Sequence, residues 1–294
     1  MLNNIRKSFV LVAVVATLST GCKYSKQYQE ITKTGNQYTA AIDELLDKAS
    51  ELQIDSTSEK LLQNDSFSNI NVDFYNNYKS NDKEMLEIIS RIRQHNSLLG
   101  EYFNTLNQLA VSKAPDNLQT EITGIATNLQ TIGSQLQTSP LLPRPMVIGE
   151  IGKLVVNSKI DGVLKNELEQ RHPIILKQLK IQEEMLTILS ELMKTRVESI
   201  KEARERRLVI NPIVGSEPIS SPKQWMDLRK EILLMDKQVQ EIEKASGALY
   251  DFQNIYKAAV EGKVNSQYLN STLEDIDRFL ALLQDNQQPT QNES

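Results

Sequence analysis

Apolar side chains recur at alternating spacings of three and four residues along most of this chain. This spacing places them on one side of an α-helix. The longest unbroken run has only two polar members and comprises Trp225, Leu228, Ile232, Met235, Val239, Ile242, Ser246, Leu249, Gln253, Tyr256 and Val260. Ser221-Pro222-Lys223-Gln224 is a good helix start before the run, and Glu261-Gly262-Lys263 is a glycine cap after it. The pattern therefore predicts one long amphipathic helix.

Similar spacing occurs in several other parts of the chain. It predicts helices over residues 24–52, 85–109, 118–136 and 269–283, and a wider apolar stripe predicts a long helix over 174–207. Residues 55–82 are more polar, and we expect a helix end, a loop and a short helix there. Residues 146–171 indicate a less regular helix that contains three glycines.

Prolines mark the breaks between these helices. Residues 139–145 contain three prolines and are predicted to form an extended connector. Pro173 either kinks its helix or opens the next one, and Asn211-Pro212 and Glu217-Pro218 mark a loop. A moderate loop between two long helices predicts an antiparallel hairpin over 173–260, with helices about 50–60 Å long.

Single amphipathic helices cannot bury their apolar faces alone, so these segments must pack together or on a partner. The predicted fold is therefore all-α, with residues 35–283 forming one elongated helical bundle. The chain has only 11 Gly and 9 Pro, and 5% of its residues are aromatic, which argues against a sandwich or barrel. The polar tail 284–294 is expected to be disordered.

The first 21 residues have the organisation of an export signal. Arg6 and Lys7 precede an apolar stretch over 9–18, which is roughly half the length needed to span a bilayer. The stretch is followed by Leu18-Ser19-Thr20-Gly21-Cys22. This motif resembles the lipobox of bacterial lipoproteins, although its leucine stands four residues before the cysteine, one further than in the commonest pattern.

The resemblance implies cleavage between Gly21 and Cys22, a diacylglyceryl group on the Cys22 thiol and often an acyl chain on the new amino group. Residues 22–34 would then be a lipid-anchored tether or a helix start. Lys23 follows the cysteine, and this resembles the default signal for the outer membrane in a bacterium with two membranes. In a bacterium with one membrane the anchor would lie in the outer face of the cytoplasmic membrane.

The sequence contains few residues that point to catalysis or to binding of a metal or cofactor. One Cys and two His leave few ligands for a metal, and no other cofactor is predicted. His95 occupies a core position and His172 precedes Pro173, so we interpret both as structural. Carboxylates at Asp43-Glu44-Asp47, Glu183-Glu184 and Glu274-Asp275-Asp277 are interpreted as solvated helix faces. Because the sequence contains no Gly-x-Ser-x-Gly, no phosphate-binding Gly-Lys-Ser/Thr loop and no paired Cys, we expect no enzyme, although a site built from scattered helix residues stays open.

Charge also restricts the partners. The chain carries 33 Lys and Arg against 38 Asp and Glu, a net charge of −5, which argues against nucleic acid. A cationic group at the end of the predicted 174–207 helix could touch anionic lipid or glycan, or more simply form a solvated helix end: Lys194, Arg196, Lys201, Arg204, Arg206 and Arg207.

The preferred functional hypothesis is a membrane-anchored binding, assembly or structural protein of the bacterial envelope. Its partner would be another envelope protein or a second copy of the chain. The alternative is an α-helical pore-forming or membrane-remodelling protein, with residues 146–156 as the candidate insertion segment. That segment contains Glu150 and Lys153 and is too short to span a bilayer.

Overall fold

The computed structural model describes residues 25–65, 71–111, 115–139, 146, 148, 155–156, 162–215, 218–250, 252–263, 271 and 274. Within these ranges the regular elements are helical: α1 (Ser25–Asp65), α2 (Val72–Val111), α3 (Pro115–Gln137), α4 (Gly162–Arg204), the π-helix η1 (Glu205–Ile210), α5 (Asn211–Val214), α6 (Pro222–Tyr250) and α7 (Phe252–Val260). The predicted all-α fold is confirmed. The signal segment, Cys22, most of the predicted 269–283 helix and the tail lie outside the described residues.

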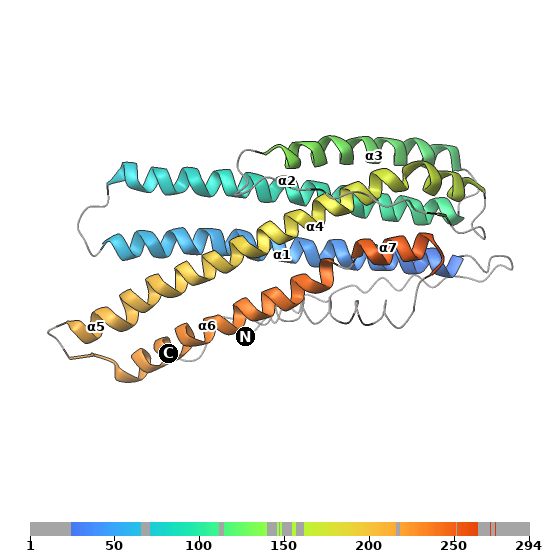
Figure 1. The fold of residues 1–294 in the computed structure, drawn as a ribbon. Coiled ribbons are helices and arrows are strands. Elements are labelled where there is room, and N and C mark those ends of the chain that lie inside the picture. Colours follow the sequence, from blue (N-terminus) through green and yellow to red (C-terminus); the bar gives the residue numbers. More distant parts are fainter. Residues whose placement is uncertain are drawn as a thin grey trace, which may run out of the picture.

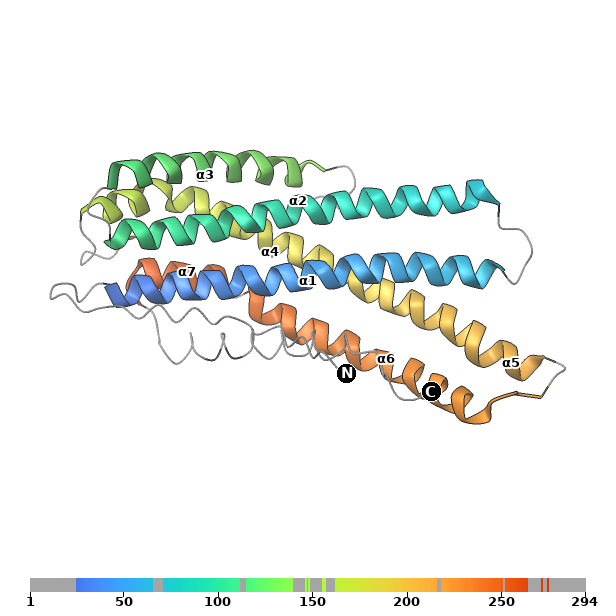
Figure 2. The same ribbon diagram turned by 180° about the vertical axis from the view of Figure 1, so that it is seen from behind.

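The molecule is an elongated bundle (Figure 1). Helices α1 and α2 lie antiparallel along its length, and α3 packs on α2 and α4 near one end. Helix α4 crosses α1 diagonally, and α6 returns beside α4, which confirms the antiparallel hairpin (Figure 2). Helix α7 lies against α1 and α4, at the end of the bundle where α1 begins.

The core is continuous through the bundle because the apolar stripes of the helices meet. Aromatic rings fill it where α7 docks on α1 and α2. The ring of Tyr38 stacks on that of Phe252 with centroids 4.0 Å apart, and Phe103 meets Phe252 edge-on at 5.6 Å. All three side chains are buried. Such ring pairs stabilise a core beyond the apolar area that they bury.

Helices α1 and α2 are longer than the sequence pattern indicates. Helix α1 extends to Asp65 and α2 begins at Val72, so the prediction for 55–82 was wrong for most of that stretch. Polar contacts replace the apolar stripe there: Gln53 and Thr57 both donate to the carboxylate of Asp82, at 2.8 and 3.0 Å. Asn71 caps α2, since its Oδ1 accepts from the backbone N–H of Phe74 at 2.8 Å.

The helix predicted over 146–171 is wrong in its first part. Met146, Ile148, Val155 and Val156 are not helical, and α4 begins only at Gly162. Gly162 has a φ of +63°, a conformation that side chains with a Cβ rarely adopt. Pro173 lies inside α4 and does not open a new helix.

The helix predicted over 222–260 begins at Pro222 as expected, but the structure describes it as α6 and α7. Asp251, between them, lies outside the described residues. The glycine cap is present. Gly262 has a φ of +68°, its N–H bonds to the carbonyl of Ala259 at 3.0 Å, and the N–H of Lys263 bonds to that of Ala258 at 2.8 Å. This pair of bonds is the Schellman motif that ends many helices.

Candidate functional site at the end of the helix hairpin

The end of the α4–α6 hairpin lies at the opposite end of the molecule from the first residues of α1 (Figures 1 and 2). We call this region the hairpin end and define it as residues 204–236. Sequence patterns predict a loop at Asn211-Pro212, but this prediction was wrong, because the helix continues to Val214.

The continuation depends on the wide turn of η1. A proline in an α-helix lacks an N–H and crowds the carbonyl four residues earlier. Here the N–H of Asn211 bonds to the carbonyl of Arg206, five residues back, and Pro212 then takes a position in the first turn of α5. A proline is tolerated there because first-turn N–H groups have no partner within the helix. Pi-helical turns of this kind are frequent at functional sites.

Polar contacts fix the hairpin end in place. The indole N–H of Trp225 on α6 donates to the backbone carbonyl of Val209 in η1 at 3.2 Å. Lys201 forms an ion pair with Asp236 at 2.7 Å, and Arg204 approaches Glu231 at 3.6 Å. These contacts join α6 to the last turns of α4 and to η1.

Glu59 is the central carboxylate of this region, because its side chain is only 8% exposed and accepts from two arginines. Arg204 Nε donates to Oε1 at 2.8 Å, and Arg207 Nη2 donates to Oε2 at 2.7 Å. Both bonds are charge-assisted and therefore stronger than bonds between neutral groups. They connect α1 to the hairpin.

The cationic group predicted at this helix end is therefore largely paired within the protein. Besides the contacts of Lys201, Arg204 and Arg207, Arg196 Nε donates to Oε1 of Gln53 at 2.8 Å. Burial lowers the pKa of Arg196, and nearby Asp82 opposes this effect. Lys194 and Arg206 also have partners. The interpretation as a solvated helix end was thus wrong for Arg196, Arg204 and Arg207, whose contacts are partly buried, whereas the pair of Lys201 with Asp236 is exposed.

Two hollows lie on the hairpin end, and Trp225 borders both. The first, which we call the tip pocket, has a volume of about 520 Å³ and is lined by parts of η1, α5 and α6 and by the loop between them, including Pro212 and Ile219. The second, which we call the α6 groove, has a volume of about 450 Å³ and is lined by Trp225, Met226, Arg229, Lys230, Leu233 and Leu234.

Large apolar side chains around these hollows are exposed to solvent. Val214 is 74% exposed, Met226 57% and Leu233 47%, and Ile213 and Leu234 are also exposed. A single exposed apolar residue is ordinary, but a group of them on one projecting part of a molecule is typical of an interaction surface.

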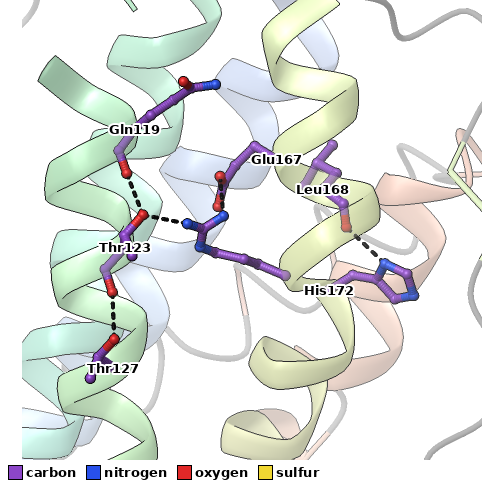
Figure 3. A network of polar contacts seen from close by, with 7 residues as sticks. Gln119, Thr123, Thr127, Glu167, Leu168 and His172 are labelled. Atoms are coloured by element: carbon purple, nitrogen blue, oxygen red, sulfur yellow. Dashed lines mark hydrogen bonds and ion pairs between the residues drawn. The ribbon is translucent and has the colours of Figure 1, made fainter. Parts of the chain in front are cut away.

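The sequence candidates for chemistry lie elsewhere and are not brought together. His95 is buried between helices, and its Nε2 lies 3.0 Å from Oε1 of Gln178 on α4. Burial lowers the pKa of His95 to about 4, although the Gln178 contact acts in the opposite direction. His172 bonds through Nδ1 to the carbonyl of Leu168, one turn earlier in its own helix, at 2.7 Å (Figure 3). Both contacts fit structural roles.

The acidic clusters are also engaged or exposed. Asp43 accepts from Asn96 at 2.9 Å, Asp47 pairs with Arg93, and Glu183 pairs with Lys180 at 2.8 Å. Glu274 is exposed, while Asp275 and Asp277 lie outside the described residues. Within the described ranges, no three His, Cys, Asp or Glu side chains are grouped so that they could hold a metal ion.

A polar connection between α3 and α4 was not anticipated from the sequence. Glu167 is buried on α4 and pairs with Arg171 at 2.7 Å, and the same guanidinium donates to Thr123 on α3 (Figure 3). Burial raises the pKa of Glu167, and Arg171 lowers it in part. The i,i+4 spacing of an acidic and a basic residue in a helix is the one signal that could have identified this pair.

No helix in the described part of the chain is long and apolar enough to cross a bilayer. The chain matches no protein family, no curated protein and no solved structure.

Proposed function

We propose that this protein is a lipid-anchored binding or assembly protein of the bacterial cell envelope, and that it presents the hairpin end to another envelope protein. The lipobox-like sequence ending at Cys22 supports attachment of the N-terminus to a membrane. Helix α1 begins at Ser25, so only Lys23 and Tyr24 would separate the acylated cysteine from the bundle. Of the predicted tether or helix start over 22–34, residues 25–34 belong to α1.

The observation that carries the proposal is the position of the exposed apolar residues relative to that anchor. Helix α1 starts at one end of the molecule and the hairpin end lies at the other (Figure 1). At 1.5 Å per residue α1 alone spans about 60 Å. An anchor at the first end would therefore hold the surface around Met226 and Val214 well away from its own lipid headgroups.

Site-specific photo-crosslinking in intact cells tests this proposal. A photoreactive amino acid replaces Met226 at the hairpin end or, as a matched control, Gln130 on the exposed face of α3. We expect a discrete protein adduct from position 226 and none from position 130. Recovery of free monomer alone from both positions would contradict a binding or assembly role.

A further inference from the structure

The α6 groove is lined by two cations, Arg229 and Lys230. Arg229 and Lys230 line it and are exposed, and neither forms an ion pair or hydrogen bond with any described residue. The carboxylates on the adjacent flank of α6 are directed elsewhere, since Glu231 faces Arg204 and Asp236 pairs with Lys201. Arg229 and Lys230 therefore lie beside exposed apolar side chains without an ion pair among the described residues.

Apart from Glu231 and Asp236, which face Arg204 and Lys201, cations outnumber carboxylates among the exposed residues of α6 between Pro222 and Asp236. Lys223, Arg229 and Lys230 are exposed along this helix, against Asp227. Met226, Leu233 and Leu234 lie between these charges at spacings of seven and eight residues, which places them on one side of the helix, two turns apart. Apolar side chains at this spacing can receive the apolar stripe of a second helix.

The shape of the surface favours a protein over a lipid bilayer. Two hollows border Trp225, whose indole is held by its bond to Val209. A preformed hollow accepts discrete side chains, whereas an amphipathic helix binds a bilayer through an apolar face that inserts into it. Charge complementarity then indicates the kind of partner. Cations beside apolar residues on this surface match carboxylates beside apolar residues on the surface of the partner.

We propose that the α6 groove binds an acidic amphipathic helix of a partner protein. The apolar stripe of that helix packs on Met226, Leu233 and Leu234, and its flanking carboxylates pair with Arg229 and Lys230. This inference rests on the proposed function, for which it specifies the chemistry of the partner.

The single Trp of the chain provides a local probe, since Trp225 borders the groove. The experiment uses the full chain with Cys22→Ser, so that binding is measured independently of lipid attachment. The probe is a synthetic helical peptide without Trp that has Leu at the heptad a and d positions and Glu on both flanks. A matched peptide has Lys in place of Glu. Binding is read from the Trp225 emission spectrum.

We expect the acidic peptide to shift the emission saturably and the basic peptide to have no effect. Arg229→Glu with Lys230→Glu should weaken the acidic peptide at least tenfold and create binding of the basic one. Lys83→Glu with Lys177→Glu is the control, because these lysines are exposed on α2 and α4 and have no ion pair with described residues. This control should bind like the parent protein.

Several results would overturn the inference. These are no saturable shift with the acidic peptide, equal binding of both peptides, or binding that the Arg229 and Lys230 reversal does not change. A shift with phosphatidylglycerol vesicles but not with the peptide would assign the surface to anionic lipid. A shift that depends only on protein concentration would assign it to a second copy. Each of these results leaves lipid attachment at Cys22 unaffected, so the two proposals fail separately.

Discussion

Gly35 on α1 packs directly against the ring of Phe103 on α2: a Cβ at Gly35 would lie 2.6 Å from Cδ2 of that ring. Glycine inside a helix is destabilising by about 1 kcal/mol relative to alanine, so from the sequence Gly35 should weaken the helix predicted over 24–52. The structure shows why a glycine fits this position. Phe103 is fully buried and also contacts Phe252 and Tyr256 of α7, so the ring has little freedom to move away.

Gly35→Ala is therefore expected to destabilise the protein despite the better helix propensity of alanine. Overpacking of a well-filled core costs about 1–3 kcal/mol, which exceeds the propensity gain. Gly124→Ala on α3 is the matched control, since nothing lies within 4 Å of its Cβ position, and it should be stabilising. Thermal unfolding of both variants checks this. Stabilisation by Gly35→Ala would show that the two helices do not approach as described.

Removal of the Glu59 carboxylate should weaken the attachment of the hairpin to α1. Glu59→Gln removes the negative charge and replaces one of the two acceptor oxygens shared by Arg204 and Arg207 with an NH2 donor, and we expect a loss of about 1–3 kcal/mol in the free energy of unfolding. Glu51→Gln removes an exposed pair with Lys48 and should change stability by less than about 1 kcal/mol. Urea unfolding measures both. Equal effects of the two substitutions would argue against the Glu59 contacts.

His95 should make the protein less stable in mild acid. Its pKa is lowered to about 4 by burial, whereas in the unfolded chain it would lie near 6.5. Between these values the unfolded state binds more protons, so stability is retained above pH 6.5 and falls as the pH decreases toward 4. The loss over this interval is roughly 3 kcal/mol.

His95→Gln provides the comparison for this pH dependence, because glutamine can still pair with Gln178 but does not titrate. Denaturant unfolding at several pH values should show the stability of the parent protein falling relative to the variant below pH 6.5. Parallel pH profiles for the two proteins would mean that His95 titrates normally in the folded state.

Neighbouring residues on α6 should respond differently to truncation. Ile232 is 2% exposed, and Ile232→Ala is expected to cost about 2–5 kcal/mol through lost burial and a cavity. Leu233 faces solvent, so Leu233→Ser should change stability by no more than about 0.5 kcal/mol. Thermal unfolding distinguishes the two. A large loss from Leu233→Ser would indicate that this side chain packs within the bundle and is not available to a partner.

The helix hairpin and most helices are predictable from the sequence because their apolar side chains keep a regular spacing. The spacing of apolar side chains does not predict a helix where polar side chains form the contacts between helices. Gln53 and Thr57 are buried at the α1–α2 interface through hydrogen bonds to Asp82, and an apolar pattern cannot reveal them. It also fails at Pro212, since a proline usually ends a helix and only the wide turn of η1 allows the helix to continue.

Less of the candidate site than of the fold is predictable from the sequence. The sequence places the cations of the α4 end close together, but their partners lie far away in the sequence: Glu59 of α1 pairs with Arg204 of α4 and Arg207 of η1. Conversely, Arg229 and Lys230 lie in a regular amphipathic helix, and nothing in the pattern separates them from ordinary exposed cations. Their importance follows from the absence of ion pairs with described residues and from the exposed apolar side chains beside them.

Lipid attachment at Cys22 determines which end of the bundle faces the membrane, and metabolic labelling with radioactive palmitate measures it. Cells that produce the parent protein are compared with cells that produce Cys22→Ser, and the purified products are examined for label. We expect a labelled parent protein and an unlabelled Cys22→Ser variant. An unlabelled parent protein, or label that persists in the variant, would contradict the anchored orientation and the role of the hairpin end that depends on it.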